Sequence, residues 1–372
     1  MSVVPRLGSS RALARLDALI ASATDPHEIA CRRAERAALL ARHGRLDEAS
    51  AEIAALKSLP ASPRVAPWIA LAEGLAAYFS ELDTSAREQV QAAYDGSAAT
   101  RQGSLHALAA AWLAHFDYVR HDTPNMVRHL AQALQLAGAD EHAARARASL
   151  VAALGFHHAG RDDLAAPWYR SVRQHATAEG DDATLSALMH NMAWLRGNHA
   201  REAAVFGGAD PAAVQQALLG AESTERFDAG LGTASLQSLV PVLRAQILVV
   251  LGRHDEALAL YGECVPLALE EGLARMEGCF RADIAWCRLQ LGDPDAARRE
   301  ALRAQACLGE EMDIDDRACA HGRLAMLYAT LGDEAAAARH RREAERDLAV
   351  HRAAQAELLD ALQRGLTGLA PR

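Results

Sequence analysis

The stretch "LGRHDEALAL" (Leu251–Leu260) is echoed by "LGDPDAARRE" (Leu291–Glu300) and "LGDEAAAARH" (Leu331–His340), so that a Leu-Gly pair, a short acidic turn and an alanine-rich run recur every 40 residues. A fixed period of this size is typical of folds built from stacked helical repeats. Glycine readily takes up the positive φ that ends a helix. Each copy is therefore predicted to form a helix, a tight turn and a second helix.

The same register extends over most of the 372 residues. A small residue lies seven positions before each turn, and the series has steps of 39, 38, 39, 40, 52, 40 and 40 residues: Ala37, Ala76, Ala114, Ala153, Ala193, Ala245, Ala285 and Ala325. The second copy is the least obvious and lies around "YFSELDTSAREQVQAAY" (residues 78–94). Apolar residues at helical spacing on both sides of the turns predict an all-α fold of about eight antiparallel helix pairs.

An alanine follows the turn glycine by five residues in several copies, namely Gly44 and Ala49, Gly160 and Ala165, Gly252 and Ala257, Gly292 and Ala297, and Gly332 and Ala337. This arrangement resembles the tetratricopeptide repeat. The resemblance implies a right-handed superhelical solenoid over about residues 26–346, with a concave groove lined by the first helix of each pair. A period near 40, in place of the usual 34, is similar to the long repeats of bacterial signalling proteins such as MalT-like activators and Rap-type phosphatases.

The ends and the one irregular step suggest three further features. Residues 1–25 are expected to form an N-terminal cap with a helix from Arg11 to Ala21, and residues 347–372 a C-terminal cap helix and tail. The 52-residue step predicts an insertion at about residues 200–232, with a loop from Ala200 to Ala209 and a helix from Pro211 to Asp228, preceded by Asp210 as N-cap. The insertion is a candidate contact element or hinge, or equally a tolerated loop.

Composition limits the function classes. A net charge of -9 and a pI near 6.0 argue against a general nucleic-acid or anionic-membrane binder. Without a signal-peptide core or an apolar run of transmembrane length, the chain is expected to be cytoplasmic. The six cysteines are predicted to be small buried hydrophobes, and neither a disulfide nor a zinc site is expected among them.

Sequence motifs that carry catalysis are missing. The chain has no G-x-x-x-x-G-K-[ST], G-x-G-x-x-G, H-E-x-x-H or G-x-S-x-G. The run "HHAGRDD" (His157–Asp163) collects possible metal ligands, but it coincides with a repeat turn where polar residues are expected anyway. The interpretation is a non-enzymatic protein without cofactor or metal.

The resemblance also implies which residues face the groove. Partner-binding residues are predicted to be Trp112, His115, His157, Asn191, Trp194, Gln246, Asp283, Trp286, Arg323 and Met326, together with Glu35 and Val151. Trp194 and Trp286 occupy equivalent places, so they either anchor a partner or fill gaps between neighbouring helices. Of the Lys, Asn and Arg that form the family's carboxylate clamp, only Asn191 clearly matches.

Three functions are consistent with these features. The leading hypothesis is a scaffold of bacterial signalling type that binds a protein or peptide in its groove, with no nucleic-acid or membrane partner and an oligomeric state that the sequence leaves open. The second is a ligand-responsive sensor, MalT-like or Rap-like, that acts on a partner in trans. The third is an enzyme or enzyme modulator of Rap type, for which Glu28 and Glu35 are the candidate acidic residues.

Overall fold

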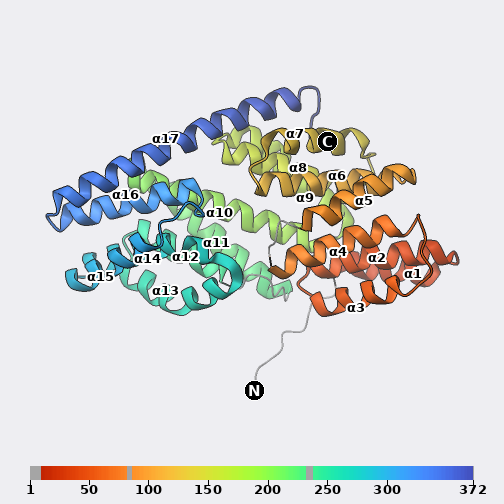
Figure 1. Ribbon diagram of the computed structural model, residues 1–372, viewed down its shortest axis with the longest axis horizontal. Helices are drawn as coiled ribbons and strands as arrows, with labels where there is room; N and C mark the ends of the chain where they lie inside the picture. Colours follow the sequence, from red (N-terminus) through yellow and green to blue (C-terminus); the bar gives the residue numbers. More distant parts are fainter. Residues whose placement is uncertain (1–9, 82–85, 232–237, 372) are drawn as a thin grey trace, which may run out of the picture. The chain divides into compact units, whose positions relative to one another are not determined.

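The computed structural model describes residues 10–81, 86–231 and 238–371. Over these ranges the chain is built from α-helices, as the sequence predicts (Figure 1). The helices are α1 (Arg11–Ser22), α2 (Pro26–Arg42), α3 (Leu46–Lys57), α4 (Ala66–Glu81), α5 (Arg87–Ala99), α6 (Gly103–Val119), α7 (Thr123–Leu136), α8 (His142–His158), α9 (Asp162–Glu179), α10 (Asp182–Phe206), α11 (Pro211–Leu231), α12 (Leu239–Val250), α13 (His254–Ala268), α14 (Glu277–Gln290), α15 (Pro294–Ala306), α16 (Ile314–Thr330) and α17 (Glu334–Gly365).

The turns between paired helices follow the predicted glycines. Positive φ values occur at Gly44, Gly160, Gly252, Gly292 and Gly332. In the third copy His121 takes the same conformation, with φ of 56°, although it has a side chain. The turn of the second copy, at residues 82–85, lies outside the described residues.

Small residues let the first helices of successive pairs pack closely. Ala37 on α2 and Ala285 on α14 are both completely buried. α2 packs against α4, α6 against α8, and α14 against α16, while each first helix also packs against its own partner, as α8 does against α9. In these contacts the first helices lie side by side, and we call the first helices of the pairs the inner helices and the layer they form the inner layer.

Contacts divide the chain into two compact units. The first comprises Met1–Leu188, Phe227–Ser235 and Glu357–Arg372, and the second comprises Met189–Arg226 and Leu236–Ala356.

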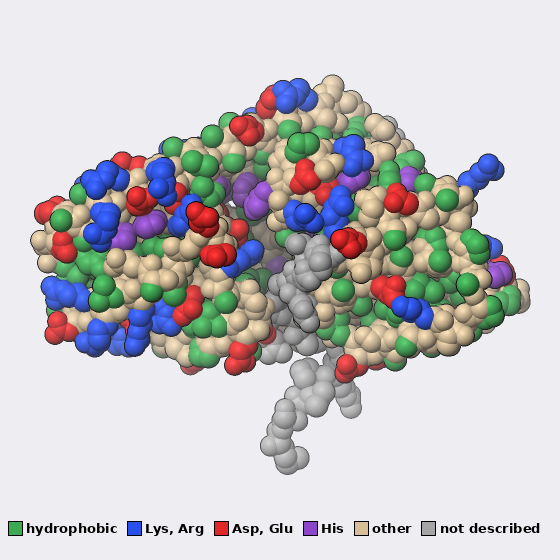
Figure 2. Space-filling model, viewed as in Figure 1, with side chains coloured by type: hydrophobic (Ala, Val, Ile, Leu, Met, Phe, Trp, Pro, Cys, Tyr) green, Lys and Arg blue, Asp and Glu red, His purple; other side chains and the backbone are tan. Residues whose placement is uncertain are grey.

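On the visible surface of each unit, acidic and basic side chains alternate without a large region of one sign (Figure 2). None of the described helices has an apolar stretch of the length needed to cross a bilayer.

In the first unit the N-terminal helix joins elements that are far apart in sequence. α1 packs against α2, and the amide of Ala12 donates to the carbonyl of Gly180 at 3.2 Å. A Cβ at Gly180 would lie 2.8 Å from the Cβ of Arg11, so the glycine permits this approach. The predicted helix at Arg11 is thus confirmed, and it links the first pair to the end of the fourth.

The predicted loop from Ala200 to Ala209 is wrong. α10 continues to Phe206, and the break falls at Gly207 and Gly208, whose φ values are 96° and 97°. The residues up to Phe206 are good helix formers, and Gly322 on α16 leaves room for Val205, where a Cβ would clash. The helix start at Pro211 is confirmed, since Asp210 accepts from the amide of Ala212 at 3.0 Å.

The last helix also differs from the expected separate cap beginning at residue 347. α17 runs unbroken from Glu334 to Gly365. Leu358 and Leu362 are buried, and in the first unit a Cβ at Gly155 of α8 would lie 2.8 Å from Leu362. Nothing in the sequence between the last repeat and this leucine stripe breaks a helix, so the two segments form one.

Candidate functional site: a pocket on the inner helices of the first unit

The first unit contains a pocket of about 550 Å³ on its inner helices. Residues from α1, α2, α4, α6 and α8 and from the segments that precede α4, α6 and α8 surround it, together with the end of α9. The lining residues are Arg15, Leu19, Glu28, Cys31, Arg32, Glu35, Arg64, Trp68, Gln102, Gly103, Ser104, Leu105, Leu108, Asp140, Glu141, His142, Ala143, Ala144 and Glu179. Acidic, basic and apolar groups thus share one concave surface.

Hydrogen bonds between neighbouring pairs fix one wall of this pocket. The indole nitrogen of Trp68 donates to Oε1 of Gln102 at 3.0 Å, and Nε2 of Gln102 donates to the carbonyl of Arg64 at 3.1 Å. Gln102 precedes α6 and Trp68 lies on α4, so these bonds hold the starts of two inner helices together. The aromatic surface of the wall is therefore positioned before any ligand arrives.

A smaller cavity of about 50 Å³ borders the pocket. The two spaces share Glu35, Trp68, Leu108, Ala143 and Glu179 as lining residues. Apolar side chains form much of the smaller cavity, which is lined also by Ala12, Leu16, Ala38, Leu39, Leu71, Leu75 and Trp112 and by the polar residues Arg42, Arg147, Asp181 and Thr184. We call this smaller space the inner cavity.

Each carboxylate that lines the inner cavity has an arginine partner. Glu179 pairs with Arg15, and Glu35 accepts from Arg32 at 2.9 Å. Asp181 accepts from Nη2 of Arg42 at 2.8 Å, between side chains 12% and 4% exposed. Burial opposes ionisation of Asp181, but Arg42 and the hydrogen bonds from Thr184 outweigh it and lower its pKa to about 2.

Arg147 is the arginine of the inner cavity without such a partner. Its side chain is on α8 and is 4% exposed, its Nε has no hydrogen-bond partner, and no described carboxylate forms an ion pair with it. The guanidinium lies 3.8 Å from the ring centroid of Trp112, whose ring also lies 5.7 Å from the guanidinium of Arg42. Burial, followed by the charge of Arg42, lowers the pKa of Arg147 to about 9.

An unpaired buried charge should reduce stability. We expect Arg147→Met to raise the free energy of unfolding by about 1 to 3 kcal/mol, because methionine fills similar space without the desolvation penalty. Urea unfolding followed by circular dichroism measures the change. A loss of stability would show that the contact with Trp112 outweighs the cost of burying the charge.

The groove residues predicted in this unit are more buried than a partner-binding role requires. Trp112 is 2% exposed and is covered by Arg147, so it lines the inner cavity and not the open pocket. His115 packs edge-on against Trp112 at 5.4 Å between ring centroids, and its Nε2 lies 3.2 Å from the Tyr78 hydroxyl. Trp112 is thus a core residue that reaches the inner cavity, and His115 is half-buried beside it.

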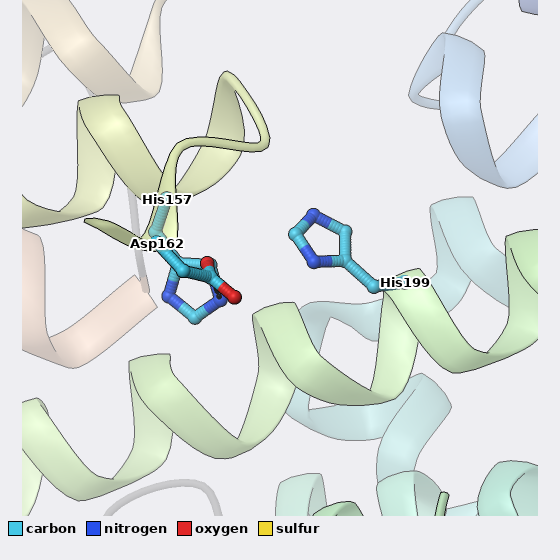
Figure 3. A group of neighbouring side chains, drawn as sticks. All are labelled: His157, Asp162 and His199. Atoms are coloured by element: carbon cyan, nitrogen blue, oxygen red, sulfur yellow. Dashed lines mark ion pairs between the residues drawn. The ribbon is translucent and has the colours of Figure 1, made fainter. Parts of the chain in front are cut away.

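His157 is also buried. Its Nδ1 lies 2.7 Å from the Tyr169 hydroxyl, and its Nε2 lies 3.4 Å from Oδ1 of Asp162 (Figure 3). His199, drawn in the same figure, lies on α10 in the second unit. The structure thus places His157 at the α8–α9 turn and outside the pocket; that no metal binds at this turn stays a prediction.

In the second unit three predicted polar residues lie on successive first helices. Gln246 on α12 is fully buried and neither of its amide atoms has a hydrogen-bond partner. Asp283 on α14 accepts from Arg323 on α16 at 3.1 Å and from the Tyr261 hydroxyl at 3.0 Å. Asp283 and Arg323 are therefore brought together as predicted, but as a buried ion pair.

The remaining predicted residues of the second unit are partly buried. Trp286 lies 5.6 Å from the Arg323 guanidinium, and Trp194 packs against the hydrophobic core of this unit. Asn191 and Met326 are half-buried. Both indoles thus combine core packing with some exposed surface, which leaves their proposed role in partner binding untested.

Two histidines of the first unit, His43 and His115, predict acid sensitivity. The pKa of His115 is lowered from 6.5 to about 3, chiefly by burial and further by the charges of Arg147 and Arg42. The pKa of His43 is lowered to about 4, chiefly by burial and further by the charge of Arg42. Both stay neutral in the folded chain while the unfolded chain takes up protons below about pH 6.5. Stability is thus complete above that pH and falls toward pH 4, by about 2 kcal/mol per histidine at pH 5.

Urea unfolding at pH 7.5 and pH 5.0 measures this effect. Replacing His115 by Gln should reduce the loss between the two pH values by about 2 kcal/mol. An identical loss in the wild type and the variant would contradict the assignment of this proton uptake to His115.

The sequence interpretation missed most of the pocket. Glu28 and Glu35 were candidates only for the enzyme hypothesis, yet both line it. Trp68 gave no signal because the second copy lacks a turn glycine that would define its register. Gln102 gave none because it lies between the second and third pairs, outside the helical pattern. Arg147 was not singled out in the sequence, although it lies on α8, whose residues Val151 and His157 were. The prediction that the cysteines are small buried residues is confirmed for five of the six, and Cys307 is partly exposed.

No family model matches the chain, and no curated protein matches it.

Proposed function

We propose that the chain is a tetratricopeptide-like solenoid that binds a peptide ligand in the pocket of its first unit and performs no catalysis itself. The observation that carries this proposal is the pocket of about 550 Å³ on the inner helices, within the range of about 300 to 1,000 Å³ that ligand sites occupy. A role in cytoplasmic signalling of bacterial type is part of the same proposal.

The chemistry of the lining supports a peptide. Trp68 and Leu108 offer apolar surface to side chains, while Gln102, Ser104 and His142 offer hydrogen-bonding groups that suit backbone amides. Charges of both signs surround these groups, so a ligand with polar and apolar parts is better matched than a purely apolar one.

A second candidate is a sensor whose state depends on a small ligand. It is favoured by α1, which contacts α2 and the loop after α9 and so closes the pocket on one side. A ligand that prefers the closed arrangement would shift the population toward it and raise the melting temperature. The two candidates use the same pocket and differ in the ligand and in the response to it.

Blocking the pocket tests the proposal. Gly103 lines it at the start of α6, and a Cβ there would meet no atom within 4 Å. Gly103→Trp should therefore fill the pocket and leave the fold intact. Immobilised wild-type protein is incubated with random pentapeptides that carry a free carboxyl terminus, and mass spectrometry identifies those retained. We expect Gly103→Trp to reduce their retention at least tenfold.

Gly262→Trp is the matched control. Gly262 is exposed on α13 in the second unit, and a Cβ there also meets no atom within 4 Å. The control should retain the same pentapeptides as the wild type. Retention of no pentapeptide by the wild type, or equal retention by Gly103→Trp, would contradict the proposed function.

A further inference from the structure

The charged residues that line the inner cavity, taken together with the arginines paired to them, include one more positive group than negative groups. Three carboxylates, Glu35, Glu179 and Asp181, are each held by an arginine of their own. Arg147 remains as a cation that is buried, unpaired and part of the cavity wall. The carboxylate that acts on Arg147, Asp181, is already bound by Arg42. A buried charge without an ion pair of its own is unfavourable, so an anion supplied from outside would find a prepared partner.

The guanidinium of Arg147 is held in a fixed place. Trp112 lies beneath it at 3.8 Å, and Trp112 is itself fixed by edge-on contacts with His115 and Phe79. A guanidinium can offer two parallel N–H donors to a carboxylate or to a phosphate. The carboxylate is the smaller of these two anions.

The size of the inner cavity sets a second limit. It measures about 50 Å³, and one water needs about 10 to 15 Å³ on this measure. The cavity therefore has room for about three to five heavy atoms. A carboxylate with its adjacent carbon has four heavy atoms, whereas a phosphate ester with its adjacent carbon has six and exceeds this room.

The surrounding walls indicate what the carboxylate is attached to. Leu16, Leu39, Leu71 and Leu75 form the apolar part of the inner cavity, and Leu108 and Trp68 continue this surface into the larger pocket. A ligand with its anionic end at Arg147 would thus have an apolar portion next to that end.

We propose that Arg147 and the inner cavity bind the carboxylate of a ligand whose adjacent part is apolar, either a small carboxylic acid or the C-terminal residue of a peptide. This inference rests on the proposed use of the pocket for ligand binding. It specifies the chemical group that enters most deeply and the residue that recognises it.

Isothermal titration with defined probes tests the inference. The probes are isocaproate, its neutral amide isocaproamide, and alanyl-alanyl-leucine with a free or an amidated carboxyl terminus. We expect isocaproate to bind the wild type, with isocaproamide at least about 30-fold weaker, because the amide cannot neutralise the arginine. Binding of the free tripeptide but not its amide would assign the site to peptide ends; binding of isocaproate alone would assign it to small acids.

Two variants link the effect to Arg147. Arg147→Gln should weaken isocaproate binding at least about 30-fold, and Arg147→Lys, which keeps the charge but not the fork, should restore part of it. Circular dichroism confirms that each variant is folded. Equal binding of acid and amide, unchanged affinity in Arg147→Gln, or no binding of any probe would overturn the inference.

Failure of the carboxylate subsite can be distinguished from failure of the proposed peptide-binding function. If pentapeptides selected by the wild type still bind after amidation and bind Arg147→Gln normally, the peptide pocket stands and the carboxylate subsite is refuted. If isocaproate binds through Arg147 while no pentapeptide is retained, the subsite stands and the peptide function fails.

Discussion

Replacing Arg42 by Met should lower the free energy of unfolding of the first unit by about 3 to 5 kcal/mol. Arg42 donates through Nη2 to both carboxylate oxygens of Asp181, at 3.0 and 2.8 Å, and to the Thr184 hydroxyl at 2.6 Å. Asp181 is 3% exposed, so the variant would leave a carboxylate buried without a cation. Urea unfolding at pH 7.5 measures the change.

A second substitution distinguishes the charge from the packing. Asp181 accepts the amide of Thr184 at 3.0 Å at the start of α10, and asparagine can keep that bond without the charge. Arg42→Met combined with Asp181→Asn should therefore recover at least half of the lost stability. If the double variant is as unstable as Arg42→Met alone, the loss comes from packing and not from the unpaired carboxylate.

The second unit should respond as strongly to the replacement of Arg201 by Met. Arg201 on α10 pairs with Asp316 on α16 at 2.8 Å, and both side chains are 4% exposed. Burial raises the pKa of Asp316 to about 6, against the attraction of Arg201, so the carboxylate depends on its partner. We expect a loss of about 3 to 5 kcal/mol at pH 7.5, limited by protonation of the aspartate.

An apolar replacement of both partners provides the control. Arg201→Met with Asp316→Leu removes both charges, and buried ion pairs replaced in this way are often as stable as before. The double variant should thus approach wild-type stability in urea unfolding. A double variant less stable than Arg201→Met would contradict the idea that an uncompensated charge causes the loss.

The sequence predicts the repeating elements well because their signals are local. A helix end with glycine at positive φ needs only neighbouring residues, and Gly252 and Gly292 behave as predicted. His121 shows that the position tolerates another residue where the rest of the pair defines the turn. The predicted loop at Ala200 failed because α10 gains support from α16, more than a hundred residues later, through Arg201.

The pocket could not be predicted because it depends on contacts across the first unit. Arg42 and Asp181 are 139 residues apart, and α1 reaches the loop at Gly180. The resemblance implies that Trp112 faces the groove, but it does not reveal that Arg147 covers the ring. The groove prediction therefore assigned exposure to a residue that is buried.

The pocket and the buried charges belong to one arrangement. The ion pair of Arg15 with Glu179 joins α1 to the end of α9, and that of Arg42 with Asp181 joins α2 to the start of α10, so both hold the walls in place around the pocket. Arg147 contributes no such pair and, on our account, reduces stability. A residue that weakens the fold while lining a cavity is the pattern expected where a ligand completes the site.

The most direct test of the proposed function is to map where a selected pentapeptide binds. A pentapeptide retained by the wild type is synthesised with a photoreactive diazirine side chain, irradiated in the complex and located by mass spectrometry. We predict crosslinks to the inner-helix segments that contain Trp68, Ser104 and Ala143, with crosslinking lost in Gly103→Trp. Crosslinks confined to the second helices of the pairs or to the second unit would contradict the assignment of this pocket as the ligand site.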